Sequence, residues 1–347
     1  EYPVIISIEQ HCCAAQRIRQ GQIMSELLGD QLLRPPWDEQ HQCIDTSKSV
    51  AISPWSARRH FLVKSSIGCC ERCRGALPLY DRCVVFPTRK LLHKLVEREL
   101  SDGSASPSAF SVEQESSPPF AVASGTVAKV VKLEKTLGQD AMRRWNASHL
   151  SRVYPEGTRI GSGNVDPVPM WLCGVQMVAM NYQTSDTGLL LNEGLFRNYN
   201  GGCGYVLKKP VTPVAEHMPA SRRLRLNICC GHRLPRPDLS QRESRGVSSP
   251  MVTVSLEPGG QVSHTRAVKQ DGYHPVFDHE VELQVSESPL HILTFEVLDT
   301  QKGLTMARSA VTLDAIRTGF RWLALYSPQG HSLPRCGLLL RVHFLPA

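Results

Sequence analysis

The pattern of apolar residues changes once along the chain, near the proline-rich stretch PVTP at 210–213. Before it, short apolar runs alternate with segments of helical spacing, which is typical of an α/β fold with parallel strands. After it, short strand-like runs follow one another between turn-rich loops, which is typical of an antiparallel β-sandwich. The sequence therefore predicts an α/β unit followed by an all-β unit, with the boundary between 210 and 221.

Polar side chains follow two apolar runs of the α/β unit. The β-branched run at 2–8 is followed by Glu9, and the run at 60–63 is followed by Lys64. Parallel strands of a (β/α)8 barrel bring their carboxyl ends to one face, which holds the active site in such enzymes. Polar strand ends are what the active site of a TIM (β/α)8 barrel needs, so the sequence is compatible with part of such a barrel. On the residues alone, however, structural or solvated surface groups are the favoured interpretation of Glu9 and Lys64.

Further elements follow from spacing and turn residues. Helical spacing is present at 14–33, 91–100 and 127–137,. The stretch 101–119 is rich in Ser and Pro and has little to bury, which indicates a disordered linker,. Further strands are expected at 150–154, 176–182 and 203–208 in the α/β unit, and at 222–230, 250–257, 279–285, 291–298 and 338–345 in the all-β unit,.

The net charge indicates the kind of binding partner, and the N-terminal residues indicate the cellular location. The formal net charge of +7 favours an anionic partner, and the basic residues are scattered rather than gathered into a nucleic-acid-binding block,. No apolar run approaches the ~20 residues that cross a bilayer. The chain opens without Met on a strand-like run, and no secretory signal is present,. We therefore expect an intracellular fragment whose beginning lies upstream.

The twelve cysteines do not form an evident disulfide framework, because several are adjacent in sequence,. Cys70 and Cys73, with Cys83 and His93 beyond, have the spacing of a zinc knuckle,. No second closely spaced ligand pair follows them. Reduced thiols are therefore favoured over a zinc site.

Three separated regions carry a resemblance to one family. They are YPVIISIEQHC at 2–12 with FLVK at 61–64, SRVYPEGTRIGSGNVDPVPMWLCGVQMVAMNYQT at 151–184 with NGGCGYVLKKP at 200–210, and DGYHPVFDHEVEL, FEVLD and GFRWLAL beyond 270. In this order they resemble the X region, the Y region and the C2 domain of eukaryotic phosphoinositide-specific phospholipases C. The sequence at 171–172 and 181–184 resembles that of the epsilon-type enzymes.

The resemblance implies four regions in the chain. The end of the catalytic X region is expected at 1–65, and a partly disordered X–Y linker at 66–118. The Y region, which is the second half of the barrel, is expected at 119–212, and the C2 β-sandwich at 221–347.

The resemblance also implies a reaction and a site. The family hydrolyses phosphatidylinositol 4,5-bisphosphate to diacylglycerol and inositol 1,4,5-trisphosphate, with calcium as cofactor. Glu9 matches the family's calcium ligand that also assists catalysis. Lys64, Ser124 and Arg152 match residues that contact the substrate phosphates, and Tyr154 matches the aromatic residue that stacks on the inositol ring.

The sequence departs from the family pattern at several positions. Ser66 stands where the family has a second phosphate-binding lysine. The two catalytic histidines and three further calcium ligands of the family lie upstream of 2–8, so the chain alone is not expected to turn over. In the C2 domain, Asp299 matches a calcium ligand, whereas Ser248 and Ser249 and the segment TQK at 300–302 stand where further Asp residues are usual. A structural module that packs on the barrel, or one that binds anionic lipid through Arg233, Arg236 and Arg245, is therefore favoured over calcium-dependent docking.

Two functions are compatible with these observations. The first is a calcium-dependent phospholipase C that is cytoplasmic and peripheral at the membrane, transduces signals, and binds phosphoinositide lipid and an anionic membrane surface. Small GTPase or G-protein regulators would then act through domains outside this chain. The alternative is a catalytically inactive scaffold that binds phosphoinositides, which Ser66 and the altered C2 loops favour.

Overall fold

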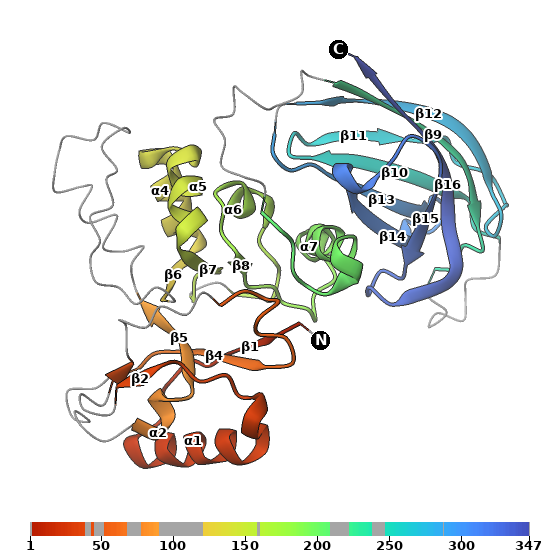
Figure 1. The fold of residues 1–347 in the computed structure, drawn as a ribbon. Coiled ribbons are helices and arrows are strands. Elements are labelled where there is room, and N and C mark those ends of the chain that lie inside the picture. Colours follow the sequence, from red (N-terminus) through yellow and green to blue (C-terminus); the bar gives the residue numbers. More distant parts are fainter. Residues whose placement is uncertain are drawn as a thin grey trace. The chain divides into compact units, whose positions relative to one another are not determined.

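The computed structural model describes residues 2–38, 43–44, 52–67, 78–89, 121–157, 160–208, 222–237, 247–286 and 288–346. The chain forms two compact units, drawn as ribbons in Figure 1. The first comprises 1–158 and 173–179, and the second comprises 159–172 and 180–347. The predicted helix at 91–100, most of the expected linker, and the expected boundary at 210–221 lie outside the described residues.

The first unit is built on a six-stranded sheet in which all paired neighbours are parallel. The strand order follows the sequence, as expected for consecutive strands of a barrel. This half-barrel confirms the predicted partial (β/α)8 fold. Its strands are β1 (Val4–Ser7), β4 (Phe61–Ser65), β5 (Val84–Arg89), β6 (Val122–Thr126), β7 (Leu150–Tyr154) and β8 (Met177–Val178). A separate short pair is formed by β2 (Trp37–Asp38) and β3 (Cys43–Ile44).

Helix α1 (Ala14–Leu28) follows β1 and packs closely on the short helix α2 (Pro78–Asp81). A methyl group at Gly21 would stand 3.0 Å from the backbone nitrogen of Tyr80, so the absent side chain permits this approach,. The helix ends earlier than the predicted 14–33, because Gly29 takes a positive φ of 48° and a 3₁₀ turn, Gly29–Gln31, follows,.

Two further helices cover the later strands of the first unit. Helix α4 (Val127–Leu137) lies where its spacing predicted it, and α5 (Gln139–Ser148) follows after Gly138. The sheet contributes buried apolar residues such as Leu62, Val85 and Val122 to a core of its own. None of the described helices is long and apolar enough to cross a membrane.

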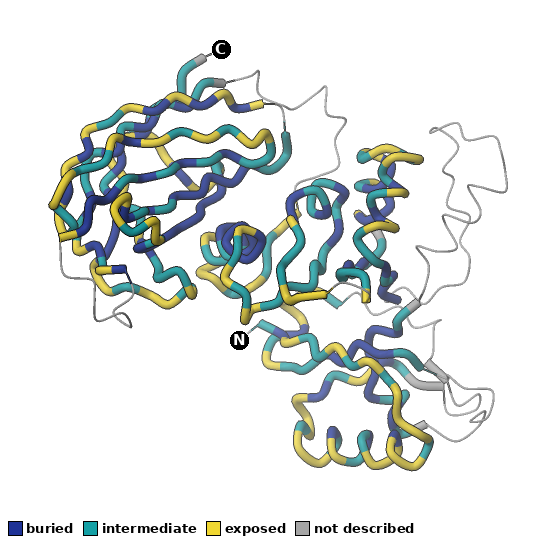
Figure 2. Tube along the Cα trace, turned by 180° about the vertical axis from the view of Figure 1, so that it is seen from behind, coloured by how far each residue is buried: buried dark blue, intermediate teal, exposed yellow. Residues whose placement is uncertain are grey.

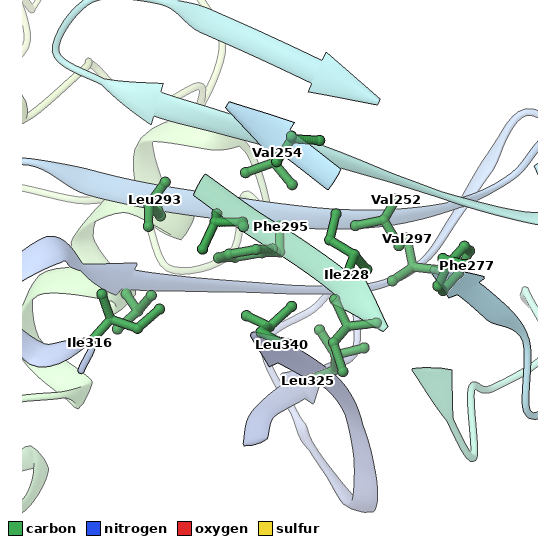
Figure 3. Close-up of a cluster of buried hydrophobic side chains, with 14 of the residues drawn as sticks. Ile228, Val252, Val254, Phe277, Leu293, Phe295, Val297, Ile316, Leu325 and Leu340 are labelled. Atoms are coloured by element: carbon green, nitrogen blue, oxygen red, sulfur yellow. The ribbon is translucent and has the colours of Figure 1, made fainter. Parts of the chain in front are cut away.

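The second unit is dominated by an antiparallel sandwich with the strand order β11-β10-β13-β14-β15-β16-β9-β12. Strands β14 and β15 pair at Arg308 and Tyr326, and strands on both sides of this pairing, among them β10, β13, β16 and β9, contribute to one core. Figure 3 shows part of this core, with Phe295 and Ile228 among its fully buried members. Figure 2 shows the alternation of buried and exposed positions along these strands. The strands are β9 (Arg222–His232), β10 (Pro250–Glu257), β11 (Gln261–His264), β12 (Val276–Val285), β13 (Ile292–Asp299), β14 (Leu304–Thr312), β15 (Gly319–Tyr326) and β16 (Ser332–Pro346).

Helix α7 (Thr187–Arg197) belongs to the sandwich unit and packs on β13 and β14. A methyl group at Gly194 would stand 2.6 Å from the Cβ atom of Ala310, so this contact requires glycine. The helix buries Leu190, Leu191 and Leu195 in a core that also includes residues of the short helix α6 (Val168–Leu172).

Two predicted strands differ in the structure. The strand expected at 176–182 is reduced to β8 (Met177–Val178). The strand expected at 203–208 is absent, because a 3₁₀ turn, Asn200–Gly202, precedes it and these described residues continue as a loop. Positive φ angles at Gly201, Gly202 and Gly204 favour this turn over an extended strand,.

Candidate active site

The candidate site residues of the first unit lie at the carboxyl edge of the parallel sheet. Lys64 is near the end of β4 and is in register with Ser7 at the end of β1. Ser124 on β6 is in register with Arg152 on β7. Glu9 comes two residues after β1. The parallel direction of the strands therefore brings these side chains to one edge, as the strand-end pattern predicted.

Lys64 is the most constrained of these side chains, with 4% of the residue exposed. Its Nζ donates a hydrogen bond to Thr88 Oγ1 at 3.0 Å. Burial, with Arg152 as a nearby positive charge, lowers the pKa of Lys64 to about 8, and Glu9 opposes this shift,. These interactions indicate that Lys64, Arg152 and Glu9 share one electrostatic environment.

Arg152 and Tyr154 extend from the same face of β7, since residues two apart in a strand share a face. The guanidinium carbon of Arg152 lies 5.3 Å from the centroid of the Tyr154 ring. This contact orients the planar guanidinium group, which can donate two parallel hydrogen bonds to a phosphate.

Ser124 presents a hydroxyl group without a hydrogen-bond partner among the described residues, although its Oγ atom is buried. A buried hydroxyl group normally has a partner, because leaving it unpaired costs free energy. Its register with Arg152 places it beside the cationic side chains of the edge. The hydroxyl group is thus available to an anionic ligand.

Glu9 is exposed, and its carboxylate lies 3.9 Å from His11 Nε2, which is also exposed. A surface pair of this kind contributes little to stability. The Glu9 carboxylate suits a calcium ion, which prefers hard oxygen ligands. The described residues contain no group of three acidic, histidine or cysteine side chains that would complete a metal site. Glu9 therefore offers one ligand, and a calcium site there requires others.

Thr88 is a site residue that sequence reasoning missed. It lies on β5, within the range 66–118 that was expected to be a linker. The run VVFPTR at 84–89 contains Pro87, which weakens a strand prediction,. The β-branched residues of this run were the available signal.

Asp299 of the sandwich unit is fully buried at the end of β13. Its Oδ1 accepts hydrogen bonds from the backbone nitrogens of Ser249 at 3.2 Å and Gln301 at 3.1 Å. Gln301 Nε2 also donates to Ser249 Oγ at 2.9 Å. Neutral side chains thus join the two loops at positions where calcium would need further carboxylates. Asp299 Oδ2 is buried without a hydrogen-bond partner among the described residues. The role of Asp299 as a calcium ligand therefore stays a prediction.

Asn164 of the longest motif and Asp186, which follows that motif by two residues, have a structural role. Asp186 caps α7 by accepting a hydrogen bond from the backbone nitrogen of Leu189 at 3.1 Å,. It also accepts hydrogen bonds from the backbone nitrogen and the side chain of Asn164. The carbonyl oxygen of Asp186 accepts a hydrogen bond from Arg308 Nη1 of β14 at 3.3 Å. These bonds hold the loop before α7 in place.

The other predicted binding residues are only partly described. Of the four residues with zinc-knuckle spacing, Cys83 is buried, and burial raises the pKa of its thiol. Cys70, Cys73 and His93 lie outside the described residues. Arg233 and Arg236 are exposed on the sandwich, and Arg245 also lies outside the described residues.

We expect the binding of an anionic headgroup to depend on pH through Lys64. Its ammonium group is charged below a pKa of about 8 and neutral above it, so affinity for inositol 1,4,5-trisphosphate should fall as the pH rises through 8. The ligand phosphates stay ionised in this range, because their second pKa is about 6. Titration calorimetry at several pH values between 7 and 9 measures the pH midpoint of this fall in affinity.

Replacing Thr88 by valine should move that midpoint to lower pH, because the ammonium group loses its hydrogen-bond acceptor,. Thr136→Val, on the exposed surface of α4, is the matched control and should leave the midpoint unchanged. An unchanged midpoint in Thr88→Val would show that this hydrogen bond does not support the charged form.

Three segments of the chain match domain families. Residues 1–66 match the family described as phosphatidylinositol-specific phospholipase C, X domain, and residues 103–211 match its Y domain. Residues 222–316 match the C2 domain family. The three matches follow the order of the resemblance found in the sequence.

Relatives and solved structures cover nearly the whole chain. The 1-phosphatidylinositol 4,5-bisphosphate phosphodiesterase of Dictyostelium discoideum is 27% identical over 99% of this chain and 49% of its own length. The human delta-1 phosphodiesterase of the same name is 26% identical over 98% of this chain and 49% of its own length. The crystal structure of S. officinalis PLC21 shares the fold with a TM-score of 0.74 and 19% identity, over 99% of this chain and 45% of that one. The chain therefore spans about half the length of these relatives, and none of them supports the epsilon-like subtype.

Proposed function

Because the chain belongs to the phosphatidylinositol-specific phospholipase C family, we propose that it supplies the second half of a barrel that hydrolyses phosphatidylinositol 4,5-bisphosphate. The relatives named for this reaction contain the same domains in the same order. The observation that supports the proposal most is the gathering of Lys64, Ser124 and Arg152 at one edge of the parallel sheet, where a polyanionic headgroup can be bound.

In this proposal the side chains have separate tasks. Lys64 and Arg152 attract the phosphates of the headgroup, and the Ser124 hydroxyl group donates a hydrogen bond to one of them. Tyr154 lies against the inositol ring. Glu9 supplies one oxygen ligand to calcium, which when bound stabilises negative charge at the reacting phosphodiester. The Asp299 carboxylate takes no part in this chemistry, because its loop is closed by hydrogen bonds.

The protein is proposed to act on bilayer lipid as a peripheral membrane protein, with G-protein or small GTPase regulation through other domains. A second candidate function is an inactive phosphoinositide scaffold. Ser66 favours it, since the site then has one lysine fewer for the ring phosphates than the family pattern.

Turnover by the full-length protein separates the two functions. Vesicles that contain phosphatidylinositol, its 4-phosphate or its 4,5-bisphosphate are incubated with calcium, and the release of water-soluble inositol phosphates is measured. The enzyme should release inositol phosphates fastest from the bisphosphate, because Lys64 and Arg152 favour the more anionic headgroup. Retained binding with no release from any of the three lipids would identify the scaffold.

A further inference from the structure

The segment that follows β1 is tied to the end of β4 by two buried side chains. The Ser65 hydroxyl group donates a hydrogen bond to the carbonyl oxygen of Ile8 at 3.1 Å. The hydroxyl group of Tyr80 on α2 donates in turn to Ser65 Oγ at 2.8 Å. Both side chains are fully buried, and we call them the buried hydroxyl pair. Ile8 directly precedes Glu9. Ser65 directly follows Lys64, so the pair connects the backbone neighbours of two candidate site residues.

The buried hydroxyl pair lies on the face of the sheet opposite to that of Lys64. Ser65 shares a face with Val63 on β4, because residues two apart in a strand point to the same side. Val63 packs with Tyr80 in one core cluster. Leu62 shares the face of Lys64 and belongs to a different cluster,. The pair therefore does not contact a ligand that Lys64 binds, and it acts on the site through the backbone.

A second contact of Tyr80 reaches the other side of Glu9. The Gln10 side chain forms a hydrogen bond with the Tyr80 hydroxyl group. Gln10 is itself held in place, because its Nε2 donates to Gln20 Oε1 of α1 at 2.8 Å. Its Oε1 accepts a hydrogen bond from the backbone nitrogen of Cys12 at 3.0 Å. Glu9 thus lies between two residues that the buried hydroxyl pair holds, although its own carboxylate is exposed.

These contacts matter because Glu9 lies beyond the regular ladder of the sheet. Strand β1 ends at Ser7, and one further backbone hydrogen bond joins the Ile8 nitrogen to the Lys64 carbonyl oxygen at 2.9 Å. Side chains must therefore fix the segment that carries Glu9. Burial raises the pKa of Tyr80, so its hydroxyl group remains a hydrogen-bond donor at neutral pH,.

The ring of Tyr80 is fixed independently of its hydroxyl group. The guanidinium carbon of Arg17, a buried residue of α1, lies 5.3 Å from the centroid of this ring. Arg17 Nη2 also donates a hydrogen bond to the carbonyl oxygen of Ser66 at 3.2 Å. Replacing Tyr80 by phenylalanine would therefore remove the hydrogen bonds of the hydroxyl group and keep the packing of the ring.

We propose that Tyr80 is a positioning residue for Glu9, whose backbone it holds at the carboxyl edge of the sheet through Ser65 and Gln10. The proposal rests on the proposed function, in which Glu9 acts at the reacting phosphodiester. Replacing a residue that supports an acting side chain from behind typically lowers activity by about 10- to 100-fold, because a small displacement weakens the action of that side chain. Lys64 has its own hydrogen bond to Thr88, so headgroup binding should not depend on Tyr80.

Steady-state turnover of a soluble short-chain phosphoinositide by the full-length protein tests this proposal. Tyr80→Phe should lower kcat by about tenfold and leave KM unchanged. Its affinity for inositol 1,4,5-trisphosphate, measured without calcium, should equal that of the wild type. Ser65→Ala interrupts the same connection and should also lower kcat. The double variant should be no slower than the slower single variant, because both substitutions remove one shared connection. Losses of kcat that multiply in the double variant would overturn the proposal, since two separate packing defects act in that way.

Met24→Ala is the matched control for loosened packing. Met24 is buried in the same core cluster as Tyr80 and carries no hydroxyl group. This substitution should lower the melting temperature more than Tyr80→Phe does, because it removes a larger buried volume. It should nevertheless keep the wild-type kcat. A wild-type kcat in Tyr80→Phe would contradict the positioning role, and so would an equal loss of kcat in Met24→Ala.

Amide hydrogen exchange without substrate separates this proposal from the proposed function. The backbone amides at 8–13 should exchange faster in Tyr80→Phe than in the wild type or in Met24→Ala. A wild type without turnover, together with faster exchange in Tyr80→Phe, would contradict the proposed reaction and retain the anchoring of Glu9 by Tyr80. Unchanged exchange at 8–13 in Tyr80→Phe would overturn the anchoring, whatever the turnover.

Discussion

Replacing Arg152 by methionine is expected to lower the affinity for inositol 1,4,5-trisphosphate by about 30- to 100-fold. Methionine keeps much of the length and volume but removes the charge and the paired donors of the guanidinium group. A charge-assisted hydrogen bond contributes about 2 to 2.8 kcal/mol, which corresponds to that change in affinity. Titration calorimetry of the full-length wild type and of its Arg152→Met variant measures this change in affinity. Any other headgroup site on the protein would be present in both titrations and would not account for the difference.

The same substitution should shift the pH dependence in a defined direction. Arg152 lowers the pKa of Lys64, so its removal should raise that pKa above about 8. The remaining affinity should then persist to higher pH than in the wild type. Arg144→Met, on the exposed surface of α5, is the matched control and should change neither quantity. A loss of affinity with an unmoved pH midpoint would contradict the shared environment of Arg152 and Lys64.

The strands of the half-barrel illustrate what the sequence could predict. The run at 150–154 alternates in burial, with Ser151 and Val153 buried, and its bounds match those of β7. Helix α4 also matches its predicted range, because apolar spacing and Gly138 define both its face and its end,. By contrast, β6 (Val122–Thr126) follows a Ser/Pro-rich stretch and has little apolar bulk, so the pattern gave no signal for it.

Helix α7 shows a second reason why an element could not be predicted from apolar spacing. Its Leu-rich stretch at 189–191 is apolar on consecutive positions rather than on one face, since the helix is buried on most sides,. Such a run does not distinguish a buried helix from a buried strand. Asp186 was the available signal, because it precedes the helix as a capping residue,.

The candidate site was predicted as a set of strand ends, and its electrostatics were not. The sequence placed Glu9 and Lys64 after predicted strands and Arg152 within one. The pKa of Lys64 depends on its burial and on residues distant in sequence, namely Arg152 and Glu9. Its hydrogen bond to Thr88 depends on the neighbouring position of β4 and β5. These quantities come from strand order and packing, which local sequence patterns do not contain.

The contacts between the loops around Asp299 also could not be predicted from local sequence patterns. The sequence identified Ser249 as a departure from a calcium-binding pattern, but it did not show how the two loops contact each other. In the structure, the hydrogen bond from Gln301 to Ser249 Oγ joins the loops directly. A substitution that removes a ligand can thus be accompanied by a neutral contact that keeps the loop closed.

The central claim is that the carboxyl edge with Glu9 performs phosphodiester hydrolysis, and Glu9→Gln tests it most directly. Glutamine preserves the shape of the side chain and removes its charge. Loss of a group that acts on the reacting atoms reduces turnover by about 10²–10⁴-fold. The full-length protein, its Glu9→Gln variant and the matched control Glu26→Gln, on the exposed surface of α1, are compared on vesicles that contain phosphatidylinositol 4,5-bisphosphate with calcium.

We expect Glu9→Gln to bind the vesicles like the wild type and to release inositol trisphosphate about 10³-fold more slowly, whereas Glu26→Gln should match the wild type in both measurements. Wild-type turnover in Glu9→Gln at wild-type vesicle binding would contradict the claim, because the carboxylate would then have no part in the reaction.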